Sequence, residues 1–483
     1  MNDLLRPGAR IYFIGIKGTG MSALAELMHK NGIRVSGSDR DEVFYTDGIL
    51  NAVGIPYHES FAAEHIEAGT DLAVYSAAYS FETNPEMAEA RRRGIPLLKY
   101  TDALGAYSAA FDAAGIAGVH GKTTTTALAG TMIRAVGLPA QILAGSAVSA
   151  FGGKATLNLG NKYFVAETCE YRKHFLAFHP RRIVLTSVEP DHQDCFPTYE
   201  SIRDAFIEYG RLLPPGAGAK PAGELIYCAD DPGAAEVAAA LDREGRGLVL
   251  VPYGFTAAGE FGIRSFRIAG ERTVIEIRGF PGELFVRIPG RHIALDAAAA
   301  LALTASLVKA EGGWNRDRQE KLRAALEDFR GSRRRSEILG ERGGILFMDD
   351  YGHHPTALRA TLEGLKEFYP RRRLIVSFMS HTYTRTAALL EEFAASFEKA
   401  DMVILHKIYA SAREAYTGGI TGRTLFERTR ALREGVFYEE EPEDAAELLR
   451  GLLRPGDLFI TMGAGDNWKL GRLLFDYYEG RTL

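Results

Sequence analysis

Short apolar runs alternate with amphipathic segments along most of the chain, which is the pattern of parallel strands separated by helices. Near the beginning, strand-like runs lie at residues 11–14, 34–38, 72–76 and 95–98, with helical spacing at 21–31 and 101–110. Near the end, strand-like runs lie at residues 345–348, 374–378, 402–405, 436–438 and 458–462. Each end of the chain is therefore predicted to form an α/β, Rossmann-like domain.

The middle of the chain predicts a different sheet. Strand-like runs lie at residues 163–166, 183–188, 225–228 and 248–253, and helical patterns at 123–136, 199–213, 233–241, 297–307 and 319–329. The alternating stretch 264–287 predicts antiparallel strands. We therefore expect three domains, namely 1–107, a central P-loop ATPase-like domain with a mixed sheet at 108–330, and 331–483.

A glycine-rich turn lies between a predicted strand and a predicted helix, at Gly115-Ile-Ala-Gly-Val-His-Gly-Lys-Thr-Thr-Thr-Thr126. The backbone N–H groups of such a turn and the N-terminus of the next helix bind phosphates. Five residues separate Gly115 from Gly121, one more than in the usual P-loop. We predict that this turn binds ATP, through Gly118, Val119, His120, Gly121, Lys122, Thr123 and Thr124.

A second glycine turn follows the first predicted strand, at Gly15-Ile-Lys-Gly-Thr-Gly20. In this context glycines let the backbone approach a diphosphate, although the glycine order differs from G-x-G-x-x-G and a purely structural turn is the alternative. Asp39 ends the second strand, where a carboxylate can bind ribose hydroxyls. The predicted substrate residues here are Gly15, Gly18, Thr19, Gly20, Met21, Ser22, Ser38, Asp39, Ser76 and Ala77.

Acidic and imidazole groups follow two strands of the central domain. Glu167 and Glu170 come after the strand 163–166, and Glu189-Pro-Asp-His192 comes after the strand 183–188. Ligands collect at the carboxyl ends of parallel strands, so Glu167 and His192 are predicted to bind Mg²⁺ together with Thr123. A purely structural histidine is the alternative for His192.

Composition narrows the choice of partners and compartment. A formal net charge of −5 over 483 residues gives no electrostatic reason to expect nucleic acid or an acidic membrane. The three cysteines, Cys169, Cys195 and Cys228, fit neither a disulfide framework nor a zinc site and are expected to be free, buried thiols. No run approaches the roughly 18 apolar residues that span a bilayer. We expect a cytoplasmic protein with small-molecule partners, monomeric or a weak homodimer.

The chain resembles the Mur ligase family over essentially its whole length. The similarity is carried by Gly15–Ser22, Ser36–Asp39, Gly118–Thr124, Glu189–His192, Pro289-Gly-Arg-His292, Asp349-Asp-Tyr-Gly-His-His-Pro355 and His381-Thr-Tyr-Thr-Arg-Thr386. The last two blocks are similar to the branch that joins L-alanine to UDP-N-acetylmuramate in peptidoglycan synthesis. The resemblance implies a UDP-substrate domain, an ATP domain and an amino-acid domain, in that order.

The resemblance also implies residue roles. Lys122 would hold the ATP phosphates, and Thr123, Glu167 and His192 the magnesium ions. Arg335 would contact the transferred phosphoryl group, Asp350 the ribose, and His292 and Asp296 the nucleotide. Tyr351, His381 and Arg385 would face the amino acid. Lys122, Glu167, His192, Arg335, His381 and Arg385 form the predicted catalytic set.

Three of the positions that depart from the family pattern bear on substrate binding. Ile293 and Asp296 stand where asparagines are thought to bind adenine, which predicts a weakened preference for ATP over GTP. Thr382 replaces an arginine that could pair with the amino-acid carboxylate, which predicts weaker binding of L-alanine or a different small amino acid.

Three other functions remain as alternatives. A recycling ligase would add a preformed peptide to UDP-N-acetylmuramate. A nicotinamide-dependent dehydrogenase would explain Gly15–Gly20 and Asp39 and leave Lys122 without a role. A non-catalytic nucleotide or UDP-sugar sensor would have no need of paired magnesium ligands.

Overall fold

The computed structural model describes residues 4–216, 221–410 and 418–480. These residues form two compact units. The first unit contains Met1–Glu189, Arg203–Gly262 and Ala299–Ala325, and the second contains Pro190–Ile202, Ile263–Ala298 and Leu326–Leu483. Each unit is described by itself.

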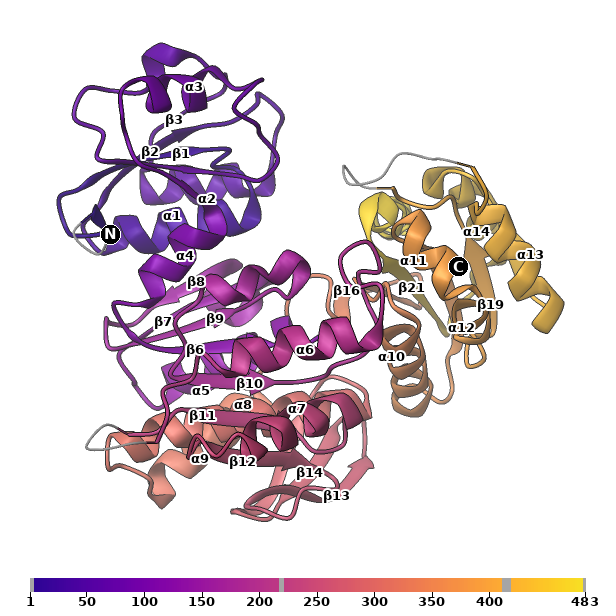
Figure 1. The fold of residues 1–483 in the computed structure, drawn as a ribbon. Coiled ribbons are helices and arrows are strands. Elements are labelled where there is room, and N and C mark those ends of the chain that lie inside the picture. Colours follow the sequence, from indigo (N-terminus) through magenta and orange to yellow (C-terminus); the bar gives the residue numbers. More distant parts are fainter. Residues whose placement is uncertain (1–3, 217–220, 411–417, 481–483) are drawn as a thin grey trace. The chain divides into compact units, whose positions relative to one another are not determined.

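The first unit begins with a parallel sheet in the order β3-β2-β1-β4-β5 (Figure 1). Its strands are β1 (Arg10–Ile14), β2 (Arg34–Ser38), β3 (Tyr57–His58), β4 (Leu72–Tyr75) and β5 (Leu97–Lys99). Its helices are α1 (Thr19–Lys30), α2 (Tyr45–Val53), α3 (Pro85–Arg92) and α4 (Tyr100–Ser108). The strand order reverses between β1 and β4, which in open α/β sheets is where ligands bind. The Rossmann-like arrangement predicted for the N-terminal residues is confirmed.

A second sheet of the same unit carries the P-loop. From β12 onward the order of its strands is β12-β11-β10-β6-β9-β7-β8, parallel except for β8 against β7. The strands are β6 (Asp112–Ala117), β7 (Ala140–Val148), β8 (Lys154–Asn158), β9 (Tyr163–Glu167), β10 (Arg182–Leu185), β11 (Glu224–Cys228) and β12 (Val249–Gly254). Helices α5 (Lys122–Ala135), α7 (Pro232–Arg243) and α9 (Arg316–Glu327) also belong to this unit, and α6 (Tyr199–Gly210) ends in it. The predicted mixed sheet is confirmed, and β7 and β8 were not predicted.

The second unit contains the sheet β16-β17-β21-β18-β19-β20, which is parallel except for β16 against β17. Its strands are β16 (Glu337–Arg342), β17 (Ile345–Asp350), β18 (Arg373–Met379), β19 (Met402–Leu405), β20 (Val436–Tyr438) and β21 (Asp457–Gly463). Its helices are α10 (Pro355–Phe368), α11 (Tyr383–Ala388), α12 (Leu390–Ala395), α13 (Gly422–Leu432), α14 (Ala445–Leu452) and α15 (Trp468–Tyr477). The predicted antiparallel stretch forms β13 (Phe261–Ile268), β14 (Thr273–Ile277) and β15 (Phe280–Val286).

The strand β17 shows why the apolar runs near the end of the chain are continuous and not alternating. Leu346 and Met348 belong to one buried cluster, whereas Ile345 and Phe347 belong to another. Successive side chains of a strand point to opposite faces of the sheet, so both faces of this sheet are covered. A strand buried on both faces has to be apolar throughout.

Helix α8 (Arg291–Ala310) corrects the expectation about membrane-spanning segments. Among the described residues it is the one helix long and apolar enough, by length and composition, to cross a bilayer. Core helices pass the same test, and 78% of its most apolar window is buried. Its alanines from Ala294 to Ala305 are almost fully buried, as close helix packing requires.

The cysteine prediction is right about the redox state and partly wrong about burial. Cys169, Cys195 and Cys228 are free, as expected. Cys228 is buried, but Cys169 is exposed and Cys195 intermediate.

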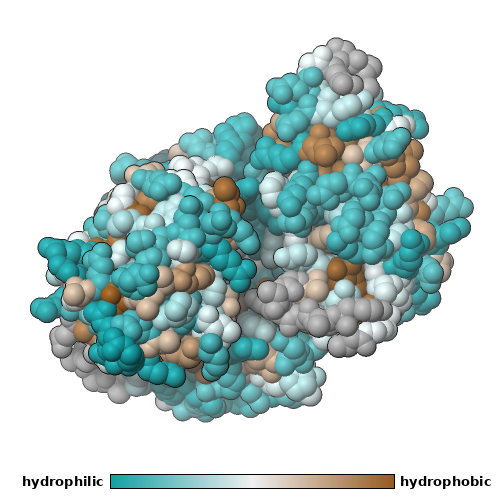
Figure 2. Space-filling view, turned by 90° about the horizontal axis from the view of Figure 1, so that it is seen from above, coloured by the Kyte–Doolittle hydropathy of each residue, from teal (hydrophilic) through white to brown (hydrophobic). Residues whose placement is uncertain are grey.

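The face in Figure 2 is mainly hydrophilic, with hydrophobic residues in small separate areas.

Candidate active site

The predicted P-loop lies between β6 and α5 and needs its glycines. Gly118 and Gly121 have φ values of 138° and 78°, which side chains rarely adopt. A Cβ atom at Gly118 would lie 2.1 Å from Thr186 Oγ1. Ser187 holds the loop in place, because its carbonyl accepts from Val119 N and its Oγ from His120 N.

Thr186 and Ser187 were expected to lie inside a strand that runs to Val188. Strand β10 instead ends at Leu185. The Thr186 hydroxyl donates to the carbonyl groups of Ala117 and His120. The chain leaves the sheet early because these residues bond to the phosphate-binding turn.

Lys122, the first residue of α5, is held by a buried carboxylate. Its Nζ lies 3.0 Å from Glu170 Oε2 and donates to the carbonyl groups of Gly118 and Val119. Burial lowers the pKa of Lys122, but Glu170 and the other anionic neighbours outweigh it, so the pKa is raised. Lys122 is therefore an ammonium ion at neutral pH and is directed into the loop.

Thr123 and Glu167 bring two hard oxygen atoms together at the ends of α5 and β9. Thr123 Oγ1 donates to Glu167 Oε2 at 2.8 Å. Gly145 on β7 lies opposite the Glu167 carboxylate. A Cβ atom at position 145 would lie only 2.2 Å from Glu167 Oε2, so a glycine is needed there. The importance of Gly145 was not predicted, because no local sequence pattern shows that a glycine makes space for a side chain distant in the chain. Hydroxyl and carboxylate oxygens are ligands that Mg²⁺ prefers.

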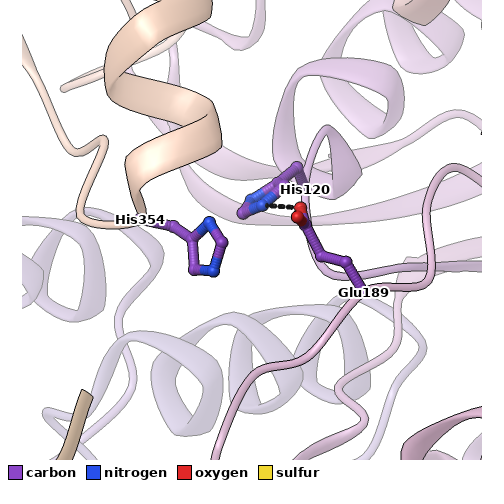
Figure 3. Close-up of side chains that lie close together, drawn as sticks. All are labelled: His120, Glu189 and His354. Carbon is purple, nitrogen blue, oxygen red and sulfur yellow. Dashed lines mark ion pairs between the residues drawn. The ribbon is translucent and has the colours of Figure 1, made fainter. Parts of the chain in front are cut away.

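His120 contacts a residue of the second motif. Figure 3 shows the Glu189 side chain pointing at His120, and the two form an ion pair between Oε1 and Nε2. His120 was predicted only as part of the phosphate-binding turn, and Glu189 had no assigned role. Their pairing ties the turn to the segment that follows β10.

The glycine turn after β1 is held by Asp39 and Tyr79. Asp39 Oδ2 accepts from Lys17 N at 2.7 Å, and Oδ1 accepts from Arg40 N and Tyr79 Oη, both at 2.9 Å. Gly15 has a φ of 84°, and a Cβ atom there would lie 2.6 Å from the Tyr79 ring. In the structure, Asp39 therefore stabilises the glycine turn, and its binding of ribose stays a prediction.

The other predicted substrate residues surround the same turn. Gly18 precedes α1, Thr19 and Gly20 begin it, and Ser22 Oγ donates to Thr19 O. Ser76 N donates to Ile14 O, which puts Ser76 and Ala77 beside the turn at the strand reversal. Met21 is buried in the core, and Ser38 Oγ donates to the buried Glu86.

In the second unit, Asp191 and Arg385 form a buried ion pair. Arg385 donates Nε and Nη2 to Asp191 Oδ1 at 2.9 and 2.7 Å. Burial raises the pKa of Asp191, but the positive charge of Arg385 outweighs it and holds the pKa well below its usual value. His192 follows in a left-handed conformation with φ 54° and lies 3.7 Å from the same carboxylate. Arg385 was predicted to face the amino acid, and this pairing was not predicted.

Aromatic side chains link the two C-terminal motifs. The ring of His353 lies edge-on to Tyr351 and to His381, with centroid separations of 5.1 and 5.5 Å. Burial lowers the pKa of His353, and the Arg385 charge lowers it further. His353 is therefore a neutral imidazole. Tyr351 and His381 therefore lie on either side of His353, and the contact of Tyr351, His381 and Arg385 with the amino acid stays a prediction.

Part of the basic run 330–335 forms a tight turn. Arg334 and Ser336 have φ values of 57° and 46°, and Arg335 lies between them. Asp350 Oδ2 accepts from Ser336 N and Oδ1 from Gly352 N, both at 2.6 Å. Asp350 therefore anchors the turn that carries Arg335, and its ribose contact stays a prediction.

His292 and Asp296, predicted to contact the nucleotide, lie in the first turns of α8. The ring of His292 lies against Gly290, where a Cβ atom would be 2.4 Å away. Ile293 is only 3% exposed and packs into the core. An isoleucine at this position is thus explained by packing.

Comparison with known proteins gives matches along the whole chain. Residues 10–112 match the catalytic domain of the Mur ligase family, 116–304 the Mur ligase middle domain, and 334–465 the Mur ligase glutamate ligase domain. UDP-N-acetylmuramate--L-alanine ligase of Treponema pallidum (strain Nichols) is 52% identical over 473 residues, which is 98% of this chain and 97% of that protein.

Relatives of lower sequence identity carry the same name or have the same fold. The Borrelia garinii protein of the same name is 36% identical over 95% of this chain and 97% of its own length. The crystal structure of UDP-N-acetylmuramate-alanine ligase MurC from Thermotoga maritima has the same fold, with a TM-score of 0.76 at 24% identity, covering 98% of this chain and 99% of that one.

Proposed function

Because the chain belongs to the Mur ligase family, we propose that it joins L-alanine to the carboxylate of UDP-N-acetylmuramate in an ATP-dependent, ADP-forming reaction. The observation that carries this proposal is the 52% identity, over nearly the full length of both chains, to an enzyme named for that reaction. The same name favours a single amino acid over a preformed peptide as second substrate. We propose 1–107, 108–330 and 331–483 as the substrate, ATP and amino-acid domains.

The chemistry explains why a charged phosphate-binding turn is needed. A carboxylate does not lose an oxygen to an amine near neutral pH. Transfer of the γ-phosphoryl group of ATP to the carboxylate gives ADP and an acyl phosphate. The amine then attacks the carbonyl carbon, phosphate leaves, and the nitrogen loses a proton as the amide forms.

Lys122 and Arg335 supply positive charge during the phosphoryl transfer. The carboxylate and the triphosphate repel each other, so cations aimed at the transferred group lower the barrier. Glu170 keeps Lys122 protonated and directed into the loop, and Asp350 fixes the turn that carries Arg335. The Lys122 ammonium is thus oriented before the substrates bind, and the backbone position of Arg335 is fixed.

Mg²⁺ fits the residues beside the P-loop. Thr123 Oγ1 and Glu167 Oε2 are 2.8 Å apart, and both oxygens would serve as ligands of the ion. Bound there, the ion supplies charge that offsets the phosphates. For His192, a ligand role stays the prediction that the resemblance gives.

We also propose that the enzyme acts in the cytoplasm, where ATP and nucleotide sugars are made, as a monomer or weak homodimer. The net charge of −5 supports the absence of nucleic-acid and acidic membrane partners.

Substrate-dependent ADP release tests the function. We expect ADP only when ATP, UDP-N-acetylmuramate and L-alanine are all present, and a product whose mass is that of the amide. Lys122→Gln is expected to lower kcat at least about a hundredfold. Lys173→Gln is the matched control, since Lys173 pairs with Glu208 on the surface. Turnover with a peptide but not with L-alanine would refute the proposal.

A further inference from the structure

Tyr100 lies at the edge of the N-terminal sheet where the glycine turn after β1 is found. It is the first residue of α4 and follows directly on β5, which is the neighbour of β4 in this parallel sheet. Its ring packs on Gly20, where a Cβ atom would lie 2.7 Å from both Cζ and Oη of Tyr100. Gly20 is inside α1, so its helical backbone does not require glycine. The Tyr100 ring is the reason for a glycine at position 20.

The Tyr100 hydroxyl has no hydrogen-bond partner among residues 4–216, 221–410 and 418–480. Other tyrosine hydroxyls of the first unit do have one, since Tyr12 donates to Glu86, Tyr79 to Asp39, Tyr107 to Gln141 and Tyr163 to Glu311. The Tyr100 side chain is only partly exposed. A half-buried phenol with a proton to donate usually has a partner, so this hydroxyl is available to a ligand.

Tyr100 also adjoins the residues beside the P-loop. Its pKa is raised by burial and further by the charge of Glu167, the carboxylate that accepts from Thr123. The preceding residue, Lys99, has its Nζ 3.1 Å from Nε2 of His174, in the segment that follows β9. Tyr100 therefore lies near both glycine turns of the first unit. With its raised pKa, the hydroxyl keeps its proton at neutral pH and acts as a donor.

Helix α4 is bonded to both sheets of the first unit. Tyr107 Oη donates to Gln141 Oε1 on β7 at 2.7 Å and accepts from Asn31 Nδ2 at the end of α1. Gly105 packs closely on the segment after β9, because a Cβ atom there would lie 2.0 Å from Ala177 O. These contacts fix the helix, and with it the place of its first residue.

We propose that Tyr100 is a substrate-binding residue whose hydroxyl donates a hydrogen bond to an anionic phosphate oxygen of the UDP-sugar. This inference rests on the proposed function, in which the turn Gly15–Gly20 binds the diphosphate. The phosphate is favoured because Oη lies beside the first turn of α1, whose N-cap, Gly18, has no side chain to bond the first N–H groups. Such N–H groups bind phosphate, and Tyr100 adds a directional bond from a second element.

This contact would help to direct the carboxylate of the substrate. The sugar connects the diphosphate to the carboxylate that receives the γ-phosphoryl group, and Tyr100 adjoins the sites proposed for both. A phosphate held by α1 on one side and by Tyr100 on the other has less freedom to rotate. Restricting its orientation restricts where the carboxylate can lie, which favours the transfer.

Titration calorimetry of the full chain without ATP tests the contact in the absence of turnover. Tyr100→Phe keeps the ring that packs on Gly20 and removes the hydroxyl. We expect Kd for UDP and for UDP-N-acetylmuramate to rise by the same factor, roughly tenfold, with Kd for ADP and Mg²⁺ unchanged. Tyr163→Phe is the matched control, because its hydroxyl bonds to Glu311 and Tyr163 lies at the opposite end of β9 from Glu167. It should leave Kd for UDP unchanged.

Three results of these titrations would overturn the inference. The first is an unchanged Kd for UDP in Tyr100→Phe, or a wild type that binds no UDP. The second is weaker binding of UDP-N-acetylmuramate alone, which would assign the hydroxyl to the sugar. The third is an equal loss of affinity for UDP and ADP together with a lower melting temperature. We expect an unchanged melting temperature, since the hydroxyl bonds to no other described residue.

Steady-state kinetics separate this inference from the proposed function. In Tyr100→Phe, KM for UDP-N-acetylmuramate should rise by about the factor found for Kd, with kcat little changed, because the bond is present before and during the transfer. A fall in kcat with an unchanged KM would contradict a phosphate contact. A wild type that forms no amide would refute the proposed ligase function, and the UDP titration would still decide the role of Tyr100.

Discussion

Glu26 on α1 accepts a hydrogen bond from Lys154 Nζ on β8 at 2.9 Å, although the two residues are 128 positions apart in the chain. The same carboxylate accepts from Thr156 Oγ1 at 2.6 Å and pairs with Lys30 at 2.8 Å. Burial alone raises the pKa of Glu26, but these three partners outweigh it and lower the pKa. The helix that begins at the N-terminal glycine turn is thus bonded to the edge of the P-loop sheet.

We expect Glu26→Gln to destabilise the first unit by about 2 kcal/mol, because charge-assisted bonds to a buried carboxylate are lost. Urea unfolding measures the change. Asp317→Asn, which removes an exposed pair with Lys321, is the control and should cost less than about 0.5 kcal/mol. Similar effects of the two substitutions would show that the Glu26 cluster contributes little.

Strands and the P-loop could be predicted because their signals are local. The run 402–405 and the turn Gly118–Thr124 each contain, within a few residues, the pattern that determines their structure. Strand β7 was missed because Gln141, Gly145 and Ser146 interrupt its apolar pattern. Gln141 is nevertheless fully buried, because its side chain bonds to Tyr107 and Asn161.

The pairing of side chains could not be predicted in the same way. Asp191 and Arg385 are 194 residues apart, and neither motif alone indicates the other as partner. Asp39 and Asp350 were predicted to bind ribose, whereas the structure shows their oxygens accepting hydrogen bonds from the backbone of nearby turns. A sequence motif indicates which residue is needed, but not which of several donors it accepts from.

Asp296 provides a test of base selection. We expect only a weak preference for ATP over GTP, because an ionised carboxylate can accept from N6–H₂ of adenine but cannot also donate to N7, so the bidentate contact by which an amide selects adenine is lost. Asp296→Asn adds a donor and should raise the ratio of kcat/KM values for ATP and GTP about tenfold.

Ile293→Asn is the comparison for that variant. It places an amide in the core, and should lower stability without changing the ratio. A large ATP preference in the wild type would refute the prediction.

Thr382 tests whether backbone strain orients His381. Thr382 has φ 65°. We expect Thr382→Gly to stabilise the second unit by about 1 kcal/mol, because glycine adopts a positive φ without strain. The same variant should bind L-alanine more weakly, since the backbone beside His381 becomes free to move. Calorimetry and steady-state kinetics measure the two effects.

Glu271→Gly is the matched control for Thr382→Gly. Glu271 has φ 54° and lies in the turn between β13 and β14. It should show a similar gain in stability with an unchanged KM for L-alanine. An unchanged KM in Thr382→Gly as well would show that the strain has no role in orienting His381.

His406 makes the stability of the second unit depend on pH. Its Nε2 lies 2.8 Å from Ser377 Oγ and its Nδ1 lies 2.9 Å from Glu439 O. Burial lowers the pKa of His406 to about 4. The unfolded chain, with an ordinary histidine pKa of about 6.5, binds the proton first as the pH falls. Stability due to the neutral imidazole is therefore present above pH 6.5 and is lost progressively between pH 6.5 and 4.

We expect the loss over this range to be on the order of 3 kcal/mol. Urea unfolding of the wild type and of His406→Gln at a series of pH values measures it, since the difference between the two proteins isolates this side chain. His179→Gln, at an exposed position, is the control and should follow the wild type at every pH. Parallel curves for the wild type and His406→Gln would mean that the imidazole keeps its ordinary pKa in the folded protein, and that its bonds to Ser377 and Glu439 do not depend on its being neutral.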